Sequence, residues 1–210
     1  MSTVAIIITI HDGDDRSSGS LEECQKQTEA IEAQGKHSFS MFINNEGEAG
    51  CPAVWEKALE GKFDFYIWMD YGLKLSEGAL EAFFENSGFL RNRAVIAGSV
   101  AGDDKSLLFG GRNKRGRLID PDPTIPVPCY LYDLSLTMVP GSVVASLDNP
   151  SDVIHRRFLD YGCGAKVAKA GIARVIAPGV LAFTSRKNDM PVWKNPDKPL
   201  GDRILSFLKR

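Results

Sequence analysis

Strand-like and helix-like segments alternate over the first hundred residues, and this feature constrains the fold most. The aliphatic run at 4–10 is typical of a strand buried on both faces of a parallel sheet. Helical spacing follows, opened by the S-x-x-E pattern of Ser20 and Glu23 and ended by Gly35. The other elements predicted here are strands at 39–43, 63–69 and 94–100 and helices opened by Pro52 and Ser76. The order βαβαβαβ predicts an α/β fold with helices on both faces of a parallel sheet.

The second half of the chain does not continue this regular alternation of strands and helices. A basic, glycine-containing loop at 110–117 precedes a proline-rich stretch at 120–128. The later predicted elements are a strand at 130–138, helices at 141–147 and 164–170, and a strand at 173–177. Beyond Thr184 prolines alternate with charges, and 202–210 predicts a short amphipathic basic helix.

Composition excludes several classes of partner. The chain has 210 residues, with 25 basic against 27 acidic side chains, so nothing favours nucleic acid as a ligand. The cysteines lack metal-ligand spacing and are expected to be reduced thiols; they are Cys24, Cys51, Cys129 and Cys163. The run at 4–10 is too short to cross a membrane, and no secretory signal is recognisable. We therefore expect no transmembrane segment and a cytoplasmic protein, at most peripheral to the inner membrane.

Polar turns follow three of the predicted strands. They lie at 11–15, 44–48 and 70–72. Ligands of parallel α/β sheets bind outside the carboxyl ends of the strands, so these turns are expected to converge on one binding site. The acidic turn at 11–15 lacks the spacing of a calcium loop, and it also argues against a nucleotidyltransferase, which needs a basic glycine-rich loop there.

Several segments together resemble a known family. They are Thr9–Gly13, Leu21–Cys24, Phe63–Asp70, Leu108–Arg112, Cys129, Met138–Pro140, Asp160, Lys169–Gly171, Ala177–Gly179 and Thr184–Arg186. Their order and spacing resemble inverting family-2 glycosyltransferases of the GT-A type, and the later segments resemble a bacterial rhamnosyltransferase-like subgroup. The likeness covers nearly the whole chain, although no single segment is highly specific.

The resemblance implies a GT-A-type nucleotide-diphospho-sugar transferase fold, with a mixed, mainly parallel central sheet and helices on both faces. It places the glycosyltransferase domain at 1–186, with a nucleotide-binding half at 1–102 and an acceptor and catalytic half at 103–186. The Pro-containing tail is 187–210. The implied activity moves a sugar with inversion from a nucleotide-diphosphate donor to a glycan, lipid-linked or protein acceptor, as in polysaccharide biosynthesis.

The resemblance also assigns residues. The catalytic base is Asp160, which takes the proton of the acceptor hydroxyl. Residues assigned in this way to the nucleotide sugar are Thr9, Asn44 and Asp70. His11 is expected to contact it from its strand end, and Arg112 from a flexible basic loop that closes on the diphosphate. Asp70 is also the implied ligand of a Mn²⁺ or Mg²⁺ ion beside the diphosphate.

Four departures keep another interpretation open, and one of them is Leu134–Ser135 in place of the family's Gly-Asn pair before Met138–Pro140. Gly72 stands where the family has the second acid of its D-x-D motif, which weakens metal binding. Asn44 replaces the acid that contacts the nucleoside, and Gly162 replaces an acid near the base. These losses favour, as the alternative, a degenerate GT-A domain that binds a nucleotide sugar or a protein partner without turnover. In the plainest interpretations Asp70 forms a turn, Asp160 caps a helix, and Arg112 belongs to a solvated basic loop.

Overall fold

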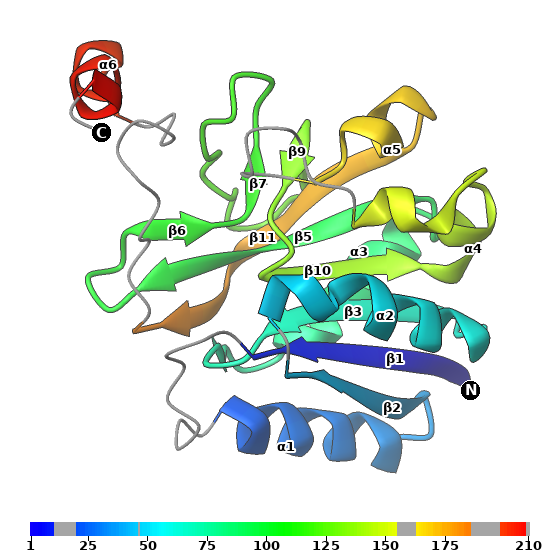
Figure 1. Ribbon diagram of the computed structural model, residues 1–210. Coiled ribbons are helices and arrows are strands. Elements are labelled where there is room, and N and C mark those ends of the chain that lie inside the picture. Colours follow the sequence, from blue (N-terminus) through cyan, green and yellow to red (C-terminus); the bar gives the residue numbers. More distant parts are fainter. Residues whose placement is uncertain (11–19, 46, 155–162, 186–197, 209–210) are drawn as a thin grey trace.

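A computed structural model of the chain describes residues 1–10, 20–45, 47–154, 163–185 and 198–208. Within them the central element is a nine-stranded sheet (Figure 1). Its main path runs β2 (His37–Asn44), β1 (Ser2–Thr9), β3 (Phe65–Asp70), β10 (Leu136–Pro140), β5 (Ala94–Gly102), β11 (Ala173–Thr184) and β4 (Lys74–Leu75). The short strands β6 (Leu107–Phe109) and β8 (Val127–Pro128) pair with β5 and β11. A separate two-stranded sheet joins β7 (Gly111–Arg112) to β9 (Leu131–Tyr132).

Most long strands run in one direction. β2 and β3 flank β1 in parallel, and β11 runs parallel to β5. The exception in the centre is β10, which lies antiparallel between β3 and β5. The predicted mixed, mainly parallel sheet is therefore confirmed, and the carboxyl ends of β1, β2 and β3 meet at one edge.

Helices cover both faces, as predicted (Figure 1). One face packs on α1 (Ser20–Ala33) and α3 (Ala79–Phe89) through a core that includes Ile6, Ile67 and Phe83. The other packs on α2 (Gly47–Glu60), α4 (Gly141–Ala145), the 3₁₀ helix η1 (Pro150–Val153) and α5 (Ala165–Lys169). Alternate residues of each central strand enter opposite cores, which is why these strands read as continuous apolar runs.

Two predicted helix starts are wrong. Gly78, with φ of 70°, is the N-cap of α3, while the Ser76 hydroxyl donates to the Val180 carbonyl at 2.9 Å, because β4 draws this segment against β11. α2 begins at Gly47, so Pro52 lies inside the helix. Proline removes one backbone donor there, near the start of the helix.

Two predicted strands also differ. The strand expected at 130–138 is split, because Tyr132 pairs with Gly111 of β7 whereas Leu136 pairs with β3. The strand expected to end at Ala177 continues to Thr184 as β11. An irregularity around Gly179, whose φ is 69°, lets β11 resume pairing with β5.

All four cysteines are free, as expected of reduced thiols. In the part of the chain that the structure describes, no helix is long and apolar enough to cross a membrane. The last helix, α6 (Leu200–Leu208), stands apart from the sheet in Figure 1.

Candidate functional site

Three of the predicted site residues end neighbouring parallel strands. Thr9 of β1 is in register with Asn44 of β2 on one side and with Asp70 of β3 on the other. All three side chains are buried. We call Asn44, Thr9 and Asp70 the strand-end row. The pairing of these strands thus brings an amide, a hydroxyl and a carboxylate side by side.

The strand-end row faces the α2 side of the sheet. Partners in register share a face, and Trp68, two residues before Asp70, belongs to the core on that side. The Trp68 indole donates to Thr9 Oγ1 at 3.1 Å. On α2, Cys51 Sγ lies 3.7 Å from the Asn44 amide nitrogen. The hydroxyl in the middle of the row is therefore held in place by an interior indole.

The backbone at the ends of these strands is also fixed. Tyr71 N donates to Thr9 O at 2.7 Å, and Ile10 N donates to Asn44 O at 2.9 Å. Asp70 N donates to Ser135 O at 2.8 Å, which ties β3 to the segment that enters β10. The row is thus carried by continuous sheet hydrogen bonding up to its last residues.

Two serines continue the polar edge across the sheet. Ser135 lies opposite Asp70, and the pairing of Thr137 with Ala97 places Ser135 beside Ser99 of β5 when it is extended by two residues. Ser99 is fully buried, and its hydroxyl has no hydrogen-bond partner. Ser99 is not among the predicted site residues, although a lone hydroxyl in the apolar strand at 94–102 was the available signal.

Gly72 has a backbone conformation that explains its presence. Its φ is 87°, in the left-handed region that favours glycine, and a Cβ added there would meet nothing within 4 Å. The turn after Asp70 therefore takes a path that an ordinary acid would adopt only with strain. Glycine therefore suits position 72 better than an acid does.

In the absence of a bound diphosphate, the described residues offer few coordinating groups to a metal ion. Among them no three His, Cys, Asp or Glu side chains come together, and Asp70 is the one carboxylate of the strand-end row. A Mg²⁺ ion is commonly held by one or two protein carboxylates together with substrate phosphates. Asp70 therefore fits a cation that binds with a diphosphate, and does not by itself form a metal site.

Arg112 is placed differently from what we expected. Its side chain is 1% exposed, and its Nε donates to the Asp133 carboxylate at 3.0 and 3.1 Å. Its Nη1 donates to Gly116 O at 3.0 Å, and Asp133 also accepts from Gly110 N at 3.1 Å. We expected a flexible basic loop that closes on the diphosphate. The charge of Arg112 is instead used inside the protein, where it pairs with Asp133 and holds the turn at Gly116.

Two side chains near this ion pair, Cys129 and Tyr132, are neutral. Burial raises the pKa of the Cys129 thiol to about 12 and holds the pKa of the Tyr132 hydroxyl well above its usual range. The Tyr132 hydroxyl donates to Val153 O at 2.6 Å, which joins β9 to η1. The Arg112–Asp133 ion pair therefore lies near the neutral side chains of Cys129 and Tyr132, with the Arg174 guanidinium as a further cation close by.

Two predicted site residues lie outside the described residues. They are His11 and Asp160. Gly162 also lies outside the described residues. Asp160, the proposed base, falls between η1 and α5 in the sequence.

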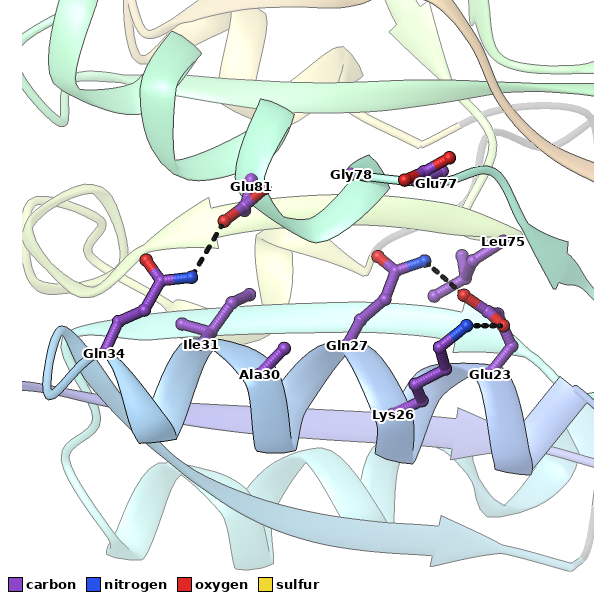
Figure 2. Close-up of a pocket in the computed structure, with 10 residues that line it drawn as sticks. All are labelled: Glu23, Lys26, Gln27, Ala30, Ile31, Gln34, Leu75, Glu77, Gly78 and Glu81. Carbon is purple, nitrogen blue, oxygen red and sulfur yellow. Dashed lines mark hydrogen bonds and ion pairs between the residues drawn. The ribbon is translucent and has the colours of Figure 1, made fainter.

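A surface pocket of about 550 Å³ lies elsewhere, between α1 and the start of α3 (Figure 2). In it Gln34 bonds Glu81 at 3.5 Å, and Glu23 bonds both Gln27 and Lys26. With Glu77 the pocket carries three carboxylates against the one ammonium of Lys26, a balance that repels a diphosphate. It also lies on the face opposite the strand-end row, so we do not assign the donor to it.

Comparison with known proteins gives a likeness in structure alone. No known protein family and no curated protein matches the sequence. The solved structure of A197 from STIV matches with a TM-score of 0.54 and 10% identity, covering 90% of this chain and 87% of A197. The structure of GalNAc-T7 with UDP, GalNAc and Mn²⁺ matches with a TM-score of 0.48 and 12% identity, covering 87% of this chain and 43% of GalNAc-T7. The match to A197 shows a shared fold.

Proposed function

We propose that this protein is an inverting glycosyltransferase of the GT-A, family-2 type, related to the rhamnosyltransferase-like subgroup. It transfers a sugar from a nucleotide-diphosphate donor to a glycan, lipid-linked or protein acceptor. The observation that carries the proposal is the register of Asn44, Thr9 and Asp70 at the carboxyl ends of parallel strands, where α/β sheets bind ligands. A position peripheral to the inner membrane, within reach of lipid-linked acceptors, belongs to the same proposal.

The row divides into two roles. Asn44, at the outer strand, offers an amide donor and an acceptor to the nucleoside, while Thr9 anchors the middle of the row. Asp70 lies on the diphosphate side. A Mn²⁺ or Mg²⁺ ion held there together with the donor would neutralise the diphosphate as it leaves. His11 remains a proposed nucleotide contact, whereas we leave Arg112 out of this site because its guanidinium is bound to Asp133.

The reaction needs one further group. The acceptor oxygen attacks the anomeric carbon, the bond from that carbon to the phosphate oxygen breaks, and the nucleoside diphosphate leaves with the bonding electron pair. The proton of the acceptor hydroxyl passes to a carboxylate, a role for which we propose Asp160. In this division 1–102 binds the nucleotide and 103–186 supplies the base and the acceptor site.

A degenerate binding domain is the second candidate, and the φ of 87° at Gly72 favours it, since the turn that would carry a second acid has a different shape. Thermal shift with UDP-, GDP- and dTDP-sugars, each with and without Mn²⁺, tests both candidates, because a ligand that binds only the folded state raises Tm. No shift with any donor would refute the enzyme and the form of the degenerate domain that binds a nucleotide sugar.

Turnover separates the two candidates. The donor that gives the largest shift is incubated with the protein, and release of nucleoside diphosphate is followed for the wild type and for Asp160→Asn. Release that is lost in Asp160→Asn, with donor binding kept, supports the enzyme. Binding with no release in the wild type supports the degenerate domain.

A further inference from the structure

The helix α6 exposes an aliphatic face. Leu200, Ile204 and Leu205 are 68%, 51% and 58% exposed, and their spacing places them on one side of the helix. None of the other described elements packs extensively against α6, which stands apart from the sheet in Figure 1. Isolated exposed aliphatic side chains are common, but three on one helical face form a patch.

The helix also needs an external partner for its own stability. A helix of 9 residues gains little in water from its backbone alone, since most helical stability comes from packing of an apolar face. Asp202 lies in the first turn, where its charge favours the helix dipole. A surface that covers the aliphatic face would therefore stabilise α6 further.

The charge around the helix indicates what that surface is. Four cationic side chains, Lys198, Arg203, Lys209 and Arg210, stand in the sequence from 197 to 210 against two acidic ones, Asp197 and Asp202. Lys198 is exposed beside the start of the helix. Aliphatic residues on one face with an excess of basic residues nearby are typical of helices that lie in the headgroup region of an anionic bilayer.

The size of the face argues against a second copy of the chain. A nine-residue helix is about 13 Å long and about 10 Å wide, so its face covers roughly 130 Å². A stable protein interface buries about 800 Å² on each partner. A membrane needs no matching shape and no minimum area.

We infer that α6 is a membrane-surface helix, which inserts Leu200, Ile204 and Leu205 into the headgroup region of an anionic bilayer. The inference deepens the peripheral membrane position included in the proposed function by naming the helix that holds it, and because this binding needs no nucleotide and no transfer activity, its test is independent of donor binding. Its physical consequence is that the protein partitions between solution and membrane according to lipid charge and ionic strength.

Co-sedimentation of the full chain with vesicles tests the inference, using phosphatidylcholine alone and phosphatidylcholine with phosphatidylglycerol. The double variant Ile204→Ser with Leu205→Ser is compared with Ile125→Ser, which removes an aliphatic side chain that is 60% exposed outside α6. The wild type and Ile125→Ser are expected to bind the anionic vesicles, and the double variant to bind them roughly ten-fold more weakly. About 0.5 M NaCl should weaken the binding of all three.

Three results of the vesicle experiment would overturn the inference. One is absence of binding to anionic vesicles by the wild type, and another is equal binding to both kinds of vesicle. The third is a double variant that binds as the wild type does. Sedimentation velocity without vesicles supplies the last test, because a dimer that is lost in the double variant would assign the face to a second copy instead.

Discussion

The strand-end row and the Arg112–Asp133 pair are both buried polar groups beside the same sheet, but their hydrogen bonds differ. Arg112 and Asp133 bind each other and nearby backbone, so their charges are balanced within the protein. In the row, Thr9 is held by the Trp68 indole, and Asp70 ends β3 in register with Thr9. A buried charge that the sequence predicts as a ligand contact can therefore have a structural role, as the Arg112–Asp133 ion pair shows.

The largest effect on stability is expected from breaking the ion pair. Asp133→Ala leaves the buried Arg112 guanidinium uncompensated, which should lower the free energy of unfolding by about 3–5 kcal/mol. Urea unfolding measures this change. Asp122→Ala, at an exposed turn, is the control and should change the free energy of unfolding far less. A loss no larger than that of the control would show that the pair is not structural.

Placing an acid at position 72 tests whether a second carboxylate increases metal binding beside Asp70. Gly72→Asp has room for its side chain but imposes a left-handed backbone on a non-glycine residue, at about 1–2 kcal/mol of stability. In the presence of nucleoside diphosphate, Mn²⁺ affinity should rise roughly ten-fold, since a second carboxylate is added. Calorimetric titration measures it. Gly72→Asn has similar strain without the charge, and an equal rise there would remove the carboxylate explanation.

Removing the unpartnered hydroxyl of Ser99 is expected to change the free energy of unfolding less, and in the opposite direction. Ser99→Ala removes a buried hydroxyl without a hydrogen bond, so the free energy of unfolding should stay the same or rise by up to about 1 kcal/mol. Thr137→Val is the matched control, because Thr137 Oγ1 donates to Asp133 O at 2.8 Å and its loss should destabilise by about 1 kcal/mol. Both are read from urea unfolding. A clear loss of stability in Ser99→Ala would mean that its hydroxyl is bonded.

The smallest effect is a pH dependence at the opposite edge of the sheet. Burial, followed by the charge of Lys36, lowers the pKa of His37 below 6.5, and its ring stacks on Phe84 at 3.9 Å. The unfolded chain therefore binds this proton more readily, so the contribution of His37 to stability is complete above pH 6.5 and declines as pH falls below it. Tm is followed across that window. His37→Phe should show a shallower decline, and an unchanged slope would contradict the assignment.

The sequence predicts the elements whose signal is local. The run at 4–10 and the helical spacing after Ser20 appear as β1 and α1, and the register of the strand-end row follows from parallel pairing. Features that depend on distant partners were not predictable. Nothing near 136–140 indicates that β10 enters the sheet antiparallel, since pairing is set by tertiary contacts.

The site shows the same division between local and distant signals. Thr9, Asn44 and Asp70 could be placed at strand ends because each directly follows an apolar run. The burial of Arg112 could not be predicted, because its partner Asp133 is 21 residues away in the sequence. The turn at Gly72 lies between these cases. The sequence shows that a glycine stands where the resemblance leads one to expect an acid, but only the structure shows its left-handed backbone.

Binding of the donor at the carboxyl edge of the sheet can be tested within β3. This strand has an aspartate at each end, one for the test and one for the control. Asp70 ends this strand at the strand-end row, whereas Asp64 precedes it at the other edge and accepts from Thr3 N at 2.8 Å. The measurement is calorimetric titration of Asp70→Asn and Asp64→Asn with the nucleotide sugar that stabilises the wild type best. We predict that Asp70→Asn binds roughly ten-fold more weakly or worse, with Tm little changed, and that Asp64→Asn binds as the wild type does. Equal affinity of Asp70→Asn and the wild type would contradict the account.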